Sequence, residues 1–213
     1  MSRFFLCFLS WIMVFALDAP PPCGDNPRLR QHSNTRGSHR DVSSMTQQTV
    51  QQPDSGEDFS RRFRNALGMF ATGITVVTSR TPAGDPIGLT VNSFNSVSLD
   101  PPLIVWSLSN DLPSRPLFEG CEYYAINVLA EDQADLSQRF AGRMGEKFAG
   151  LEIDDGLGGV PLLKGCCARF VCRNTVRHAG GDHVLFVSEV VGFDRDERAP
   201  LLYFGGNYRR LAP

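Results

Sequence analysis

A polar stretch with apolar residues on both sides is the part of the chain whose residue types best suit ligand binding. Its hydroxyl and amide side chains are Asn92, Ser93, Asn95, Ser96 and Ser98. Such groups donate and accept hydrogen bonds, and beside backbone N–H groups they can hold a phosphate and the edge of a polar heterocycle. A plain Ser/Asn-rich connection on an ordinary β-barrel is the alternative explanation.

A histidine in the sequence Gly181-Asp182-His183 is the second candidate for chemistry. It stands at the start of an expected strand, so its imidazole can project from a hairpin end into a cleft. Asp182 is expected to shape the turn through its side chain rather than to contact a ligand. The alternative for His183 is a surface turn residue, and we expect no role for His178.

Several common chemistries lack their sequence patterns in this chain. No Gly-x-Gly-x-x-Gly precedes an expected helix, because Gly156, Gly158 and Gly159 have the wrong spacing and follow no strand. There is no nucleophile elbow, no Cys–His signature and no carboxylate-rich metal motif. The six cysteines form no Cys-x-x-Cys pair, so we expect buried free thiols and no metal site.

Two apolar runs, 87–91 and 103–108, are expected strands that position the polar stretch, since both carry β-branched residues. Asp100-Pro101-Pro102 stops regular pairing between them, because proline lacks an N–H group. The other expected elements run from an amphipathic helix to a long β-hairpin and a last strand. They are helix 59–70 with Asp58 or Ser60 as its N-cap, strand 74–78, helix 117–121, strand 123–129, helix 131–140, helix 144–148, the hairpin 166–176 with 184–193, and strand 201–204.

The order of five motifs resembles that of the short-chain flavin reductases, small NAD(P)H:flavin oxidoreductases that feed two-component monooxygenases. The motifs are 88–94 with 96–103, Tyr124-Ala125-Ile126-Asn127, Arg139-Phe140, Lys147-Phe148 and Gly181-Asp182-His183. The resemblance covers about 59–211. It implies a mainly β fold, an antiparallel split β-barrel (FMN-binding split barrel) of six or seven strands with peripheral α-helices. It also implies a homodimer with the flavin near the interface, to which segments 123–129 and 103–106 are expected to contribute.

The same resemblance implies a site for FMN or FAD and for NADH or NADPH. In the family a loop at 110–116 closes over the flavin phosphate end, where Ser114 and Arg115 are suitable donors. The matching histidine lies on the nicotinamide side of the flavin, so His183 is the one catalytic candidate, orienting the carboxamide or the pyrophosphate. The implied cofactor-binding residues are Pro86, Ile87, Gly88, Leu89, Thr90, Asn92, Ser93, Phe94, Ser107, Leu108, Ser109, Ser114, Arg139, Phe140, His183 and Tyr208.

The function implied by the resemblance is hydride transfer from nicotinamide to flavin, with the reduced flavin passed to a separate oxygenase component. Two alternatives stay open. One is a non-catalytic split barrel that holds flavin or haem, and the Gly-Asp-His sequence favours the reductase over it. The other is an oxidase of pyridoxamine phosphate, which would need a basic cluster that the sequence does not show.

Composition and the N-terminal residues indicate which partners, domain boundaries and cellular location to expect. The chain has 213 residues, a net charge of −2 and no block of like charge, so nucleic acid and membrane are not expected partners. Residues 1–56 are expected to be a disordered extension with an apolar, signal-like segment at 4–17, and 57–213 the reductase domain. A translation start near Met45 is favoured over export, and we expect a cytoplasmic protein.

Overall fold

The computed structural model describes residues 56–142 and 146–212. The expectations for the N-terminal extension, including segment 4–17 and the start near Met45, concern residues outside these ranges. Within the described ranges, no helix combines the length and the hydropathy that a membrane span requires. All described residues belong to one unit, Ser55–Pro213.

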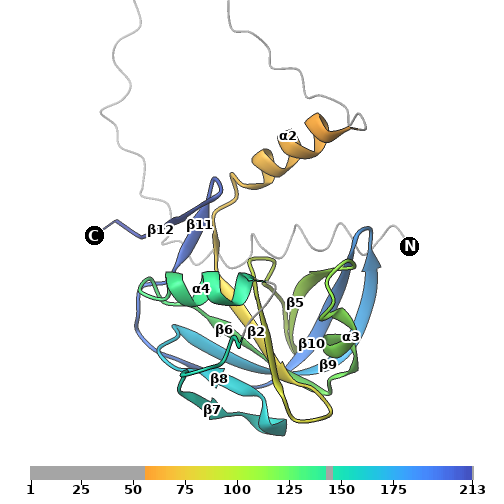
Figure 1. Cartoon of the computed structure of the whole chain (residues 1–213), viewed down its shortest axis with the longest axis vertical. Coiled ribbons are helices and arrows are strands. Elements are labelled where there is room, and N and C mark those ends of the chain that lie inside the picture. Colours follow the sequence, from red (N-terminus) through yellow and green to blue (C-terminus); the bar gives the residue numbers. More distant parts are fainter. Residues whose placement is uncertain (1–55, 143–145, 213) are drawn as a thin grey trace, which may run out of the picture. The chain divides into compact units, whose positions relative to one another are not determined.

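Seven antiparallel strands form the central sheet, in the order β3-β2-β6-β9-β10-β5-β4 (Figure 1). They are β2 (Thr75–Arg80), β3 (Pro86–Val91), β4 (Asn95–Leu99), β5 (Pro102–Ser109), β6 (Tyr123–Val128), β9 (Ala168–Gly180) and β10 (His183–Arg195). A two-residue turn joins β9 to β10, and Gly181 in this turn has a φ of 72°, which glycine adopts without strain. The sheet confirms the expected mainly β, antiparallel architecture of six or seven strands.

The two edge strands of this sheet, β3 and β4, are neighbours in the sequence. Only Asn92, Ser93 and Phe94 separate them, and a connection of this length reaches about 14 Å at most. The sheet must therefore curve until its edges approach each other, yet the two edges do not pair. We call residues 92–94 the seam. A sheet that curves in this way without closing is a split barrel.

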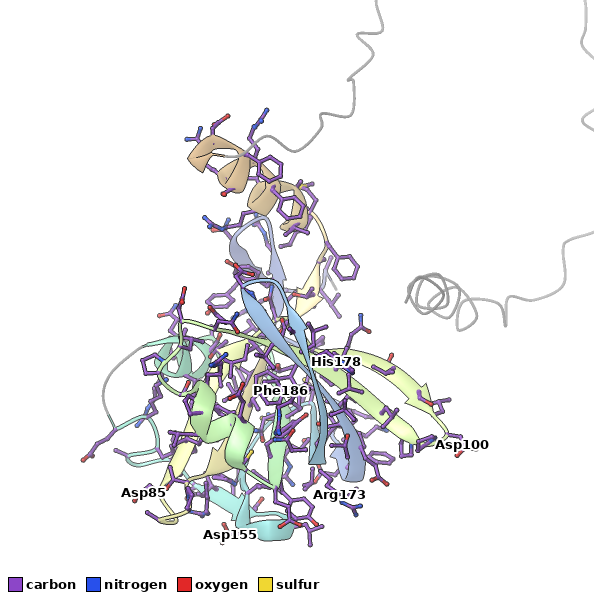
Figure 2. The ribbon with its side chains drawn as sticks, turned by 90° about the vertical axis from the view of Figure 1, so that its right-hand side faces the viewer. Asp85, Asp100, Asp155, Arg173, His178 and Phe186 are labelled. Carbon is purple, nitrogen blue, oxygen red and sulfur yellow. The ribbon has the colours of Figure 1, made fainter. Side chains whose placement is uncertain are left out.

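Inward-facing side chains of β5, β6 and β10 fill the interior. Along β5 burial alternates with period two, so that Ile104, Trp106 and Leu108 are buried and the residues between them are half-exposed. Trp106 stacks on Phe186 with ring centroids 4.5 Å apart, and Tyr124 meets both rings edge-on. Figure 2 shows Phe186 surrounded by side chains of the ribbon. Burial of these large rings is a main source of stability for the sheet.

Short elements lie around the central sheet. α4 (Ala134–Ala141) lies over β3 and β2, and α3 (Arg115–Gly120) lies against β9 (Figure 1). The remaining ones are α2 (Glu57–Leu67), β1 (Thr72–Gly73), β7 (Ile153–Asp155), the 3₁₀ turn η3 (Leu157–Gly159), β8 (Pro161–Leu163), β11 (Leu202–Phe204) and β12 (Asn207–Arg209). β1, β11 and β12 form a small sheet, and β7 pairs with β8. The expected peripheral helices are thus confirmed.

The polar stretch after the seam is itself a strand, β4, which the sequence does not predict. β4 pairs with β5, and its register shifts between Ser96 and Ser98. A bulge of this kind breaks the alternation by which a strand is recognised in a sequence. The expected order of strand, polar connection and strand is therefore wrong at β4, although the connection survives as the three seam residues.

Three predictions on helices and the hairpin also differ from the structure. α2 follows Gly56, so Asp58 and Ser60 both lie inside the helix rather than at its N-cap. Residues 147 and 148, from the expected helix 144–148, belong to a turn at 147–150, and residues 144 and 145 lie outside the described ranges. The hairpin strands extend to Gly180 and begin again at His183, because a two-residue turn suffices where the sequence predicted a seven-residue connection.

Segments expected at a dimer interface are mostly buried within the single chain. Residues 124–127 are fully covered, since β6 lies between β2 and β9. Ile104 and Trp106 face the interior. The expectation that 123–129 and 103–106 provide the interface is wrong for these residues. Among the exposed large apolar side chains, four are grouped on α2 and directly after it; they are Phe63, Leu67, Met69 and Phe70.

Candidate functional site

The seam is fastened to β5 by one serine hydroxyl. Ser93 Oγ donates to Ser107 O at 3.1 Å and accepts from Ser107 N at 3.0 Å. Because the hydroxyl has only one proton, its donor is used within the protein, and a ligand would meet Ser93 chiefly through its backbone. Phe94 packs against Phe170 with ring centroids 5.7 Å apart, while Asn92 is exposed. Asn92 is thus the seam side chain most accessible to a ligand.

Ser107, Ser109 and His183 lie on one face of the sheet. Burial alternates along β5, so both serines face away from the core. Ser109 stands directly opposite His183 in the β5–β10 ladder, and Ser107 stands opposite Leu185. Residues directly opposed in an antiparallel pair present their side chains to the same face. The structure therefore brings together three of the residues expected to bind flavin and nicotinamide.

The ring of His183 contacts the residue before it in the chain. His183 Nδ1 lies 2.7 Å from Asp182 Oδ1. This hydrogen bond lowers the pKa of the Asp182 carboxyl, which is ionised at neutral pH and accepts hydrogen bonds without donating any. The sequence predicts a turn-forming role for Asp182, and the contact with His183 is a second role that it does not reveal.

Asn110 joins the loop after β5 to the turn between β9 and β10. Its backbone N–H donates to Asp182 O at 2.9 Å, and its side-chain Nδ2 donates to Gly181 O at 3.1 Å. Arg115 Nη1 in turn donates to Asn110 Oδ1 at 3.2 Å. The loop 110–116, expected at the phosphate end of a flavin, is thus fixed to the Gly-Asp-His turn. No sequence motif pointed to Asn110, because its contacts lie about seventy residues away in the chain.

Two polar groups expected to contact the flavin phosphate stand at the start of α3. Ser114 occupies the N-cap position of this helix without a side-chain capping bond. Arg115, the first helical residue, faces Glu119 with 3.8 Å between Nε and Oε1. An anion at this end of the loop would meet a hydroxyl and a planar guanidinium, although Glu119 offsets part of the positive charge.

A second group of expected residues lies around α4. Thr90 Oγ1 donates to Ser137 O at 2.7 Å, and Ser137 Oγ lies 2.9 Å from Tyr208 OH. These two hydrogen bonds connect β3, α4 and β12. Tyr208 also packs edge-on against Tyr203, with ring centroids 6.0 Å apart. Tyr208 is therefore placed with Thr90 at α4, and segment 90–93 links this group to the seam.

Phe140 is fully buried and packs against Gly88. A Cβ atom on Gly88 would lie 2.6 Å from Phe140 Cε1, so only glycine fits beneath the ring. Phe148 meets the Phe140 ring edge-on, with centroids 5.0 Å apart. Contrary to the expectation that Phe140 covers a flavin ring, its side chain has no exposed face. Leu108 is likewise buried on the inner face of β5 and can contact a ligand only through its backbone.

Two basic side chains fasten the segment after α4. Arg139 Nη2 donates to the carbonyl oxygens of Glu146 and Ala149. Lys147 Nζ donates to Gly88 O at 3.1 Å and to the last turn of α4 at 3.0 Å. Burial lowers the pKa of Lys147, since it penalises the charged form. Arg139, expected at the flavin, thus donates to protein carbonyl groups instead. Lys147 holds β3 and α4 together at the site, and only the Lys-Phe motif pointed to it in the sequence.

The other expected residues lie on the edge strand β3. Leu89 is buried in the interior cluster, and Ile87 packs against that cluster. Pro86 begins the strand, at an edge position where the missing N–H group costs no hydrogen bond. These three residues support the strand that carries Gly88 and Thr90 to the seam.

Charged residues line a cavity elsewhere in the fold. Its volume is about 360 Å³, and it is lined by Asp154, Lys164, Gly165, Cys166, Arg169, Asp194, Arg195 and Asp196. None of the expected site residues lines it. Arg169 pairs with Asp154 at 2.8 Å and with Asp194 at 2.6 Å, so its charge is already neutralised by the protein.

The described cysteines are free thiols. Burial raises the pKa of Cys166 and of Cys172 to about 12. A thiol with so high a pKa is protonated at neutral pH and therefore unreactive. Burial and the free state of Cys166 and Cys172 agree with the expectation of buried free thiols. Within residues 56–142 and 146–212, no cluster of three or more His, Cys, Asp or Glu residues could hold a metal ion.

The chain matches known proteins over most of its described residues. A family model for the flavin reductase like domain matches residues 67–212. The chain is 47% identical over 157 residues to an FMN reductase (NADH), SmoA, of Agrobacterium fabrum, which covers 74% of this chain and 89% of that protein. It is 37% identical over 155 residues to HsaB, the reductase subunit of a flavin-dependent monooxygenase of Rhodococcus jostii, covering 72% and 78%. It also matches the solved structure of the NADH:FAD oxidoreductase SgcE6 of Streptomyces globisporus in complex with NAD and FAD fragments. That match has a TM-score of 0.70 at 32% identity and covers 76% of this chain and 98% of the other.

The matched range contains every element that carries an expected site residue, from β3 to β12. It includes the seam, the β5–β10 pair with the Gly-Asp-His turn, and α4 with its contacts to Thr90 and Gly88. The family match therefore rests on the whole split sheet and not on one motif. The chain belongs to the flavin reductase-like family.

Proposed function

We propose that this chain is a flavin reductase that takes a hydride from NADH or NADPH, delivers it to FMN or FAD, and supplies the reduced flavin to a separate monooxygenase component. The names of the relatives support the flavin, the NADH and the oxygenase partner, because they include an NADH-dependent FMN reductase, a monooxygenase reductase subunit and an NADH:FAD oxidoreductase. The observation that carries the proposal is the grouping of Ser107, Ser109 and His183 on one face of the sheet, next to the seam.

This reaction asks the protein for positioning rather than for a nucleophile. Reduced nicotinamide supplies two electrons and a hydrogen as hydride, and flavin accepts it. The protein has to hold the two rings in contact and in register, which hydrogen-bonding groups at the ring edges achieve. The seam and the Gly-Asp-His turn carry such groups, and no acid–base residue beyond His183 is required.

We assign the flavin to the side of the seam and the nicotinamide to the side of the turn. Backbone groups of 88–93, with the Asn92 amide and the two lone pairs of Thr90 Oγ1, would hold the flavin ring edge. Ser114 and the Arg115 guanidinium would meet the flavin phosphate. Ser109 and His183 lie opposite each other beside the β9–β10 turn and would face the nicotinamide. The hydroxyl of Tyr208 would line the α4 side of the same site.

We propose a homodimer, supported by the exposed apolar side chains of α2 and the residues after it. Phe63, Leu67 and Phe70 are 53%, 59% and 71% exposed in the single chain. Apolar side chains grouped in this way are typical of association surfaces. Light scattering with parallel activity measurements tests the proposal, and a fully active monomer would contradict it.

We also propose that the enzyme works in the cytoplasm together with its oxygenase partner. NADH and NADPH are regenerated there, and hydride transfer cannot continue without them. The proposal predicts that a tagged full-length chain fractionates with cytoplasmic proteins and keeps its activity in that fraction. Recovery of the active protein from the exported fraction would contradict it.

A direct assay separates the reductase from the alternative of a non-catalytic flavin- or haem-binding barrel. Purified protein is mixed with FMN and NADH in air, and the loss of the nicotinamide absorbance is followed. We expect repeated turnover. Rates measured with FMN and with FAD, and with NADH and with NADPH, then show which flavin and which dinucleotide the enzyme prefers. Tight flavin binding without any NADH or NADPH oxidation would favour the binding module.

A further inference from the structure

We propose that the interior of the central sheet binds one buried water molecule between Trp106 Nε1, Tyr124 OH and Ser188 Oγ. These side chains come from β5, β6 and β10, and all three are completely buried. None of the three atoms forms a hydrogen bond with another described residue. The water site would lie in the core, on the opposite face of β5 and β10 from Ser109 and His183.

Buried polar groups without partners are costly to the fold. Trp106 Nε1–H can only donate a hydrogen bond, whereas the hydroxyls of Tyr124 and Ser188 both donate and accept. A polar group that leaves water on folding and gains no new partner destabilises the native state. Proteins therefore pair nearly all such groups, either with one another or with an ordered water. Unpaired groups on three neighbouring strands accordingly point to a bound partner.

The three groups converge on one part of the core. The rings of Trp106 and Tyr124 meet edge-on with centroids 5.5 Å apart, and Phe186 contacts both rings. Ser188 follows Phe186 by two residues on β10, so both side chains point to the same inner face. Burial raises the pKa of Tyr124, and the side chains of Ser188 and Trp106 act against this rise. The Tyr124 hydroxyl therefore lies near the other two groups.

Water is the ligand that fits these groups. The three atoms have almost no exposed surface, and the cluster around them is apolar, which excludes a nucleotide or another organic molecule. A water donates as well as accepts, so it can accept from Trp106 Nε1–H and bond to both hydroxyls, and about three hydrogen bonds are usual for a buried water. Ser188 is smaller than Phe186 and Val190, its neighbours on the inner face of β10, so the side chains fill less volume at this point.

A crystal structure of the full chain, at a resolution that shows ordered waters, tests the site directly. We expect one water within hydrogen-bond distance of Trp106 Nε1, Tyr124 OH and Ser188 Oγ. Direct hydrogen bonds among the three side chains, with no water between them, would overturn the proposal. An empty space between the three atoms would overturn it as well.

The melting temperature of Tyr124→Phe distinguishes a hydroxyl that binds water from one without a partner, because the two cases predict opposite signs. The variant keeps the ring that packs against Trp106 and Phe186 and loses only the hydroxyl. If the hydroxyl binds the water, the Tm should fall by about 1–6 °C, which corresponds to one hydrogen bond in a domain of this size. A Tm that stays the same or rises would overturn the proposal.

A double variant tests whether the two hydroxyls share one ligand. Ser188→Ala alone should also lower the Tm. Combined with Tyr124→Phe, it should lower the Tm by less than the sum of the two single losses, because both hydroxyls bind the same water. Additive losses would contradict a shared water. Tyr123→Phe is the matched control, since Tyr123 is half-buried on the same strand and belongs to a different cluster. It should keep the wild-type Tm, and a fall equal to that of Tyr124→Phe would also contradict the proposal.

Discussion

Replacing Gly88 by alanine tests why glycine stands at this point of β3. Two explanations compete, a close approach of the ligand to the strand and the packing of Phe140 over it. A Cβ atom at Gly88 would lie 2.6 and 2.8 Å from two ring carbons of Phe140 and 3.3 Å from Phe148 Cζ. Distances below 3.0 Å are strongly repulsive, so either Phe140 or β3 has to move. Because Phe140 is a residue of α4 and is fully buried, its ring has little room to move, and we expect the fold itself to bear the strain.

The cost of this substitution can be worked out from the packing. An extra methyl group in a filled core destabilises a protein by about 1–3 kcal/mol. In a domain of this size each kcal/mol lowers the Tm by about 2–4 °C, so a fall of roughly 2–12 °C is expected. Gly192→Ala, also within a strand, is the matched control, because a Cβ there meets nothing within 4 Å. Thermal unfolding followed by circular dichroism, with and without FMN, measures both variants.

A companion substitution separates packing from ligand approach. Phe140→Leu removes the ring carbons that the new methyl group would strike, so Gly88→Ala should cost less in that background than alone. If Gly88→Ala left the Tm unchanged and weakened FMN binding, the packing explanation would be refuted. Glycine would then be required at this position for the ligand.

Three further predictions follow from the contacts of the site and from the buried thiols. His183→Ala should raise the KM for NADH and slow flavin reduction in stopped-flow traces, with a tenfold to hundredfold loss of efficiency for a hydrogen bond worth about 1–3 kcal/mol. His178→Ala, at an exposed position of the same hairpin, should behave as wild type, and equal rates in all three proteins would contradict a role at the nicotinamide. Ser93→Ala removes both hydrogen bonds to the β5 backbone and should lower the free energy of unfolding in urea by about 1–2 kcal/mol; an unchanged midpoint would show that the seam does not depend on it. Iodoacetamide at neutral pH should leave Cys166 and Cys172 unmodified in the folded protein, because their raised pKa keeps the thiols protonated, and mass spectrometry that finds them labelled before unfolding would contradict this.

The sequence predicts the long elements of the fold but, apart from α3 and β11, misses the short ones, for a physical reason. β5 and the hairpin strands carry enough apolar or alternating residues to be recognised from the chain alone. β12 is three residues long and exists because Tyr208 pairs with Tyr203 on β11. β4 is polar and bulged. Such strands are fixed by their partners across the sheet, and a local pattern does not contain that information.

The parts of the candidate site that depend on motifs in the chain could be predicted. The parts that depend on which way a side chain points, or on contacts between remote residues, could not. The motifs drew attention to Ser109 and His183, which the sheet then placed opposite each other. The inward direction of Phe140 could not be predicted, because a phenylalanine on an amphipathic helix can serve the core or a ligand equally well. Its burial depends on Gly88, about fifty residues earlier. Asn110 likewise acts through a hairpin turn that is remote in sequence.

The unpaired edges of β3 and β4 also bear on how this protein avoids aggregation through strand pairing. β3 and β4 each have one side without a neighbouring strand in the described part of the chain, and bare strand edges invite pairing with other molecules. Two devices that discourage such pairing are present: Pro86 begins β3, and β4 is bulged between Ser96 and Ser98. Neither device places another strand along β3 or β4, so the seam residues between these strands can remain available to a ligand. A variant that replaced Pro86 and straightened β4 would therefore be expected to aggregate by edge-to-edge strand addition even if its core were as stable as before.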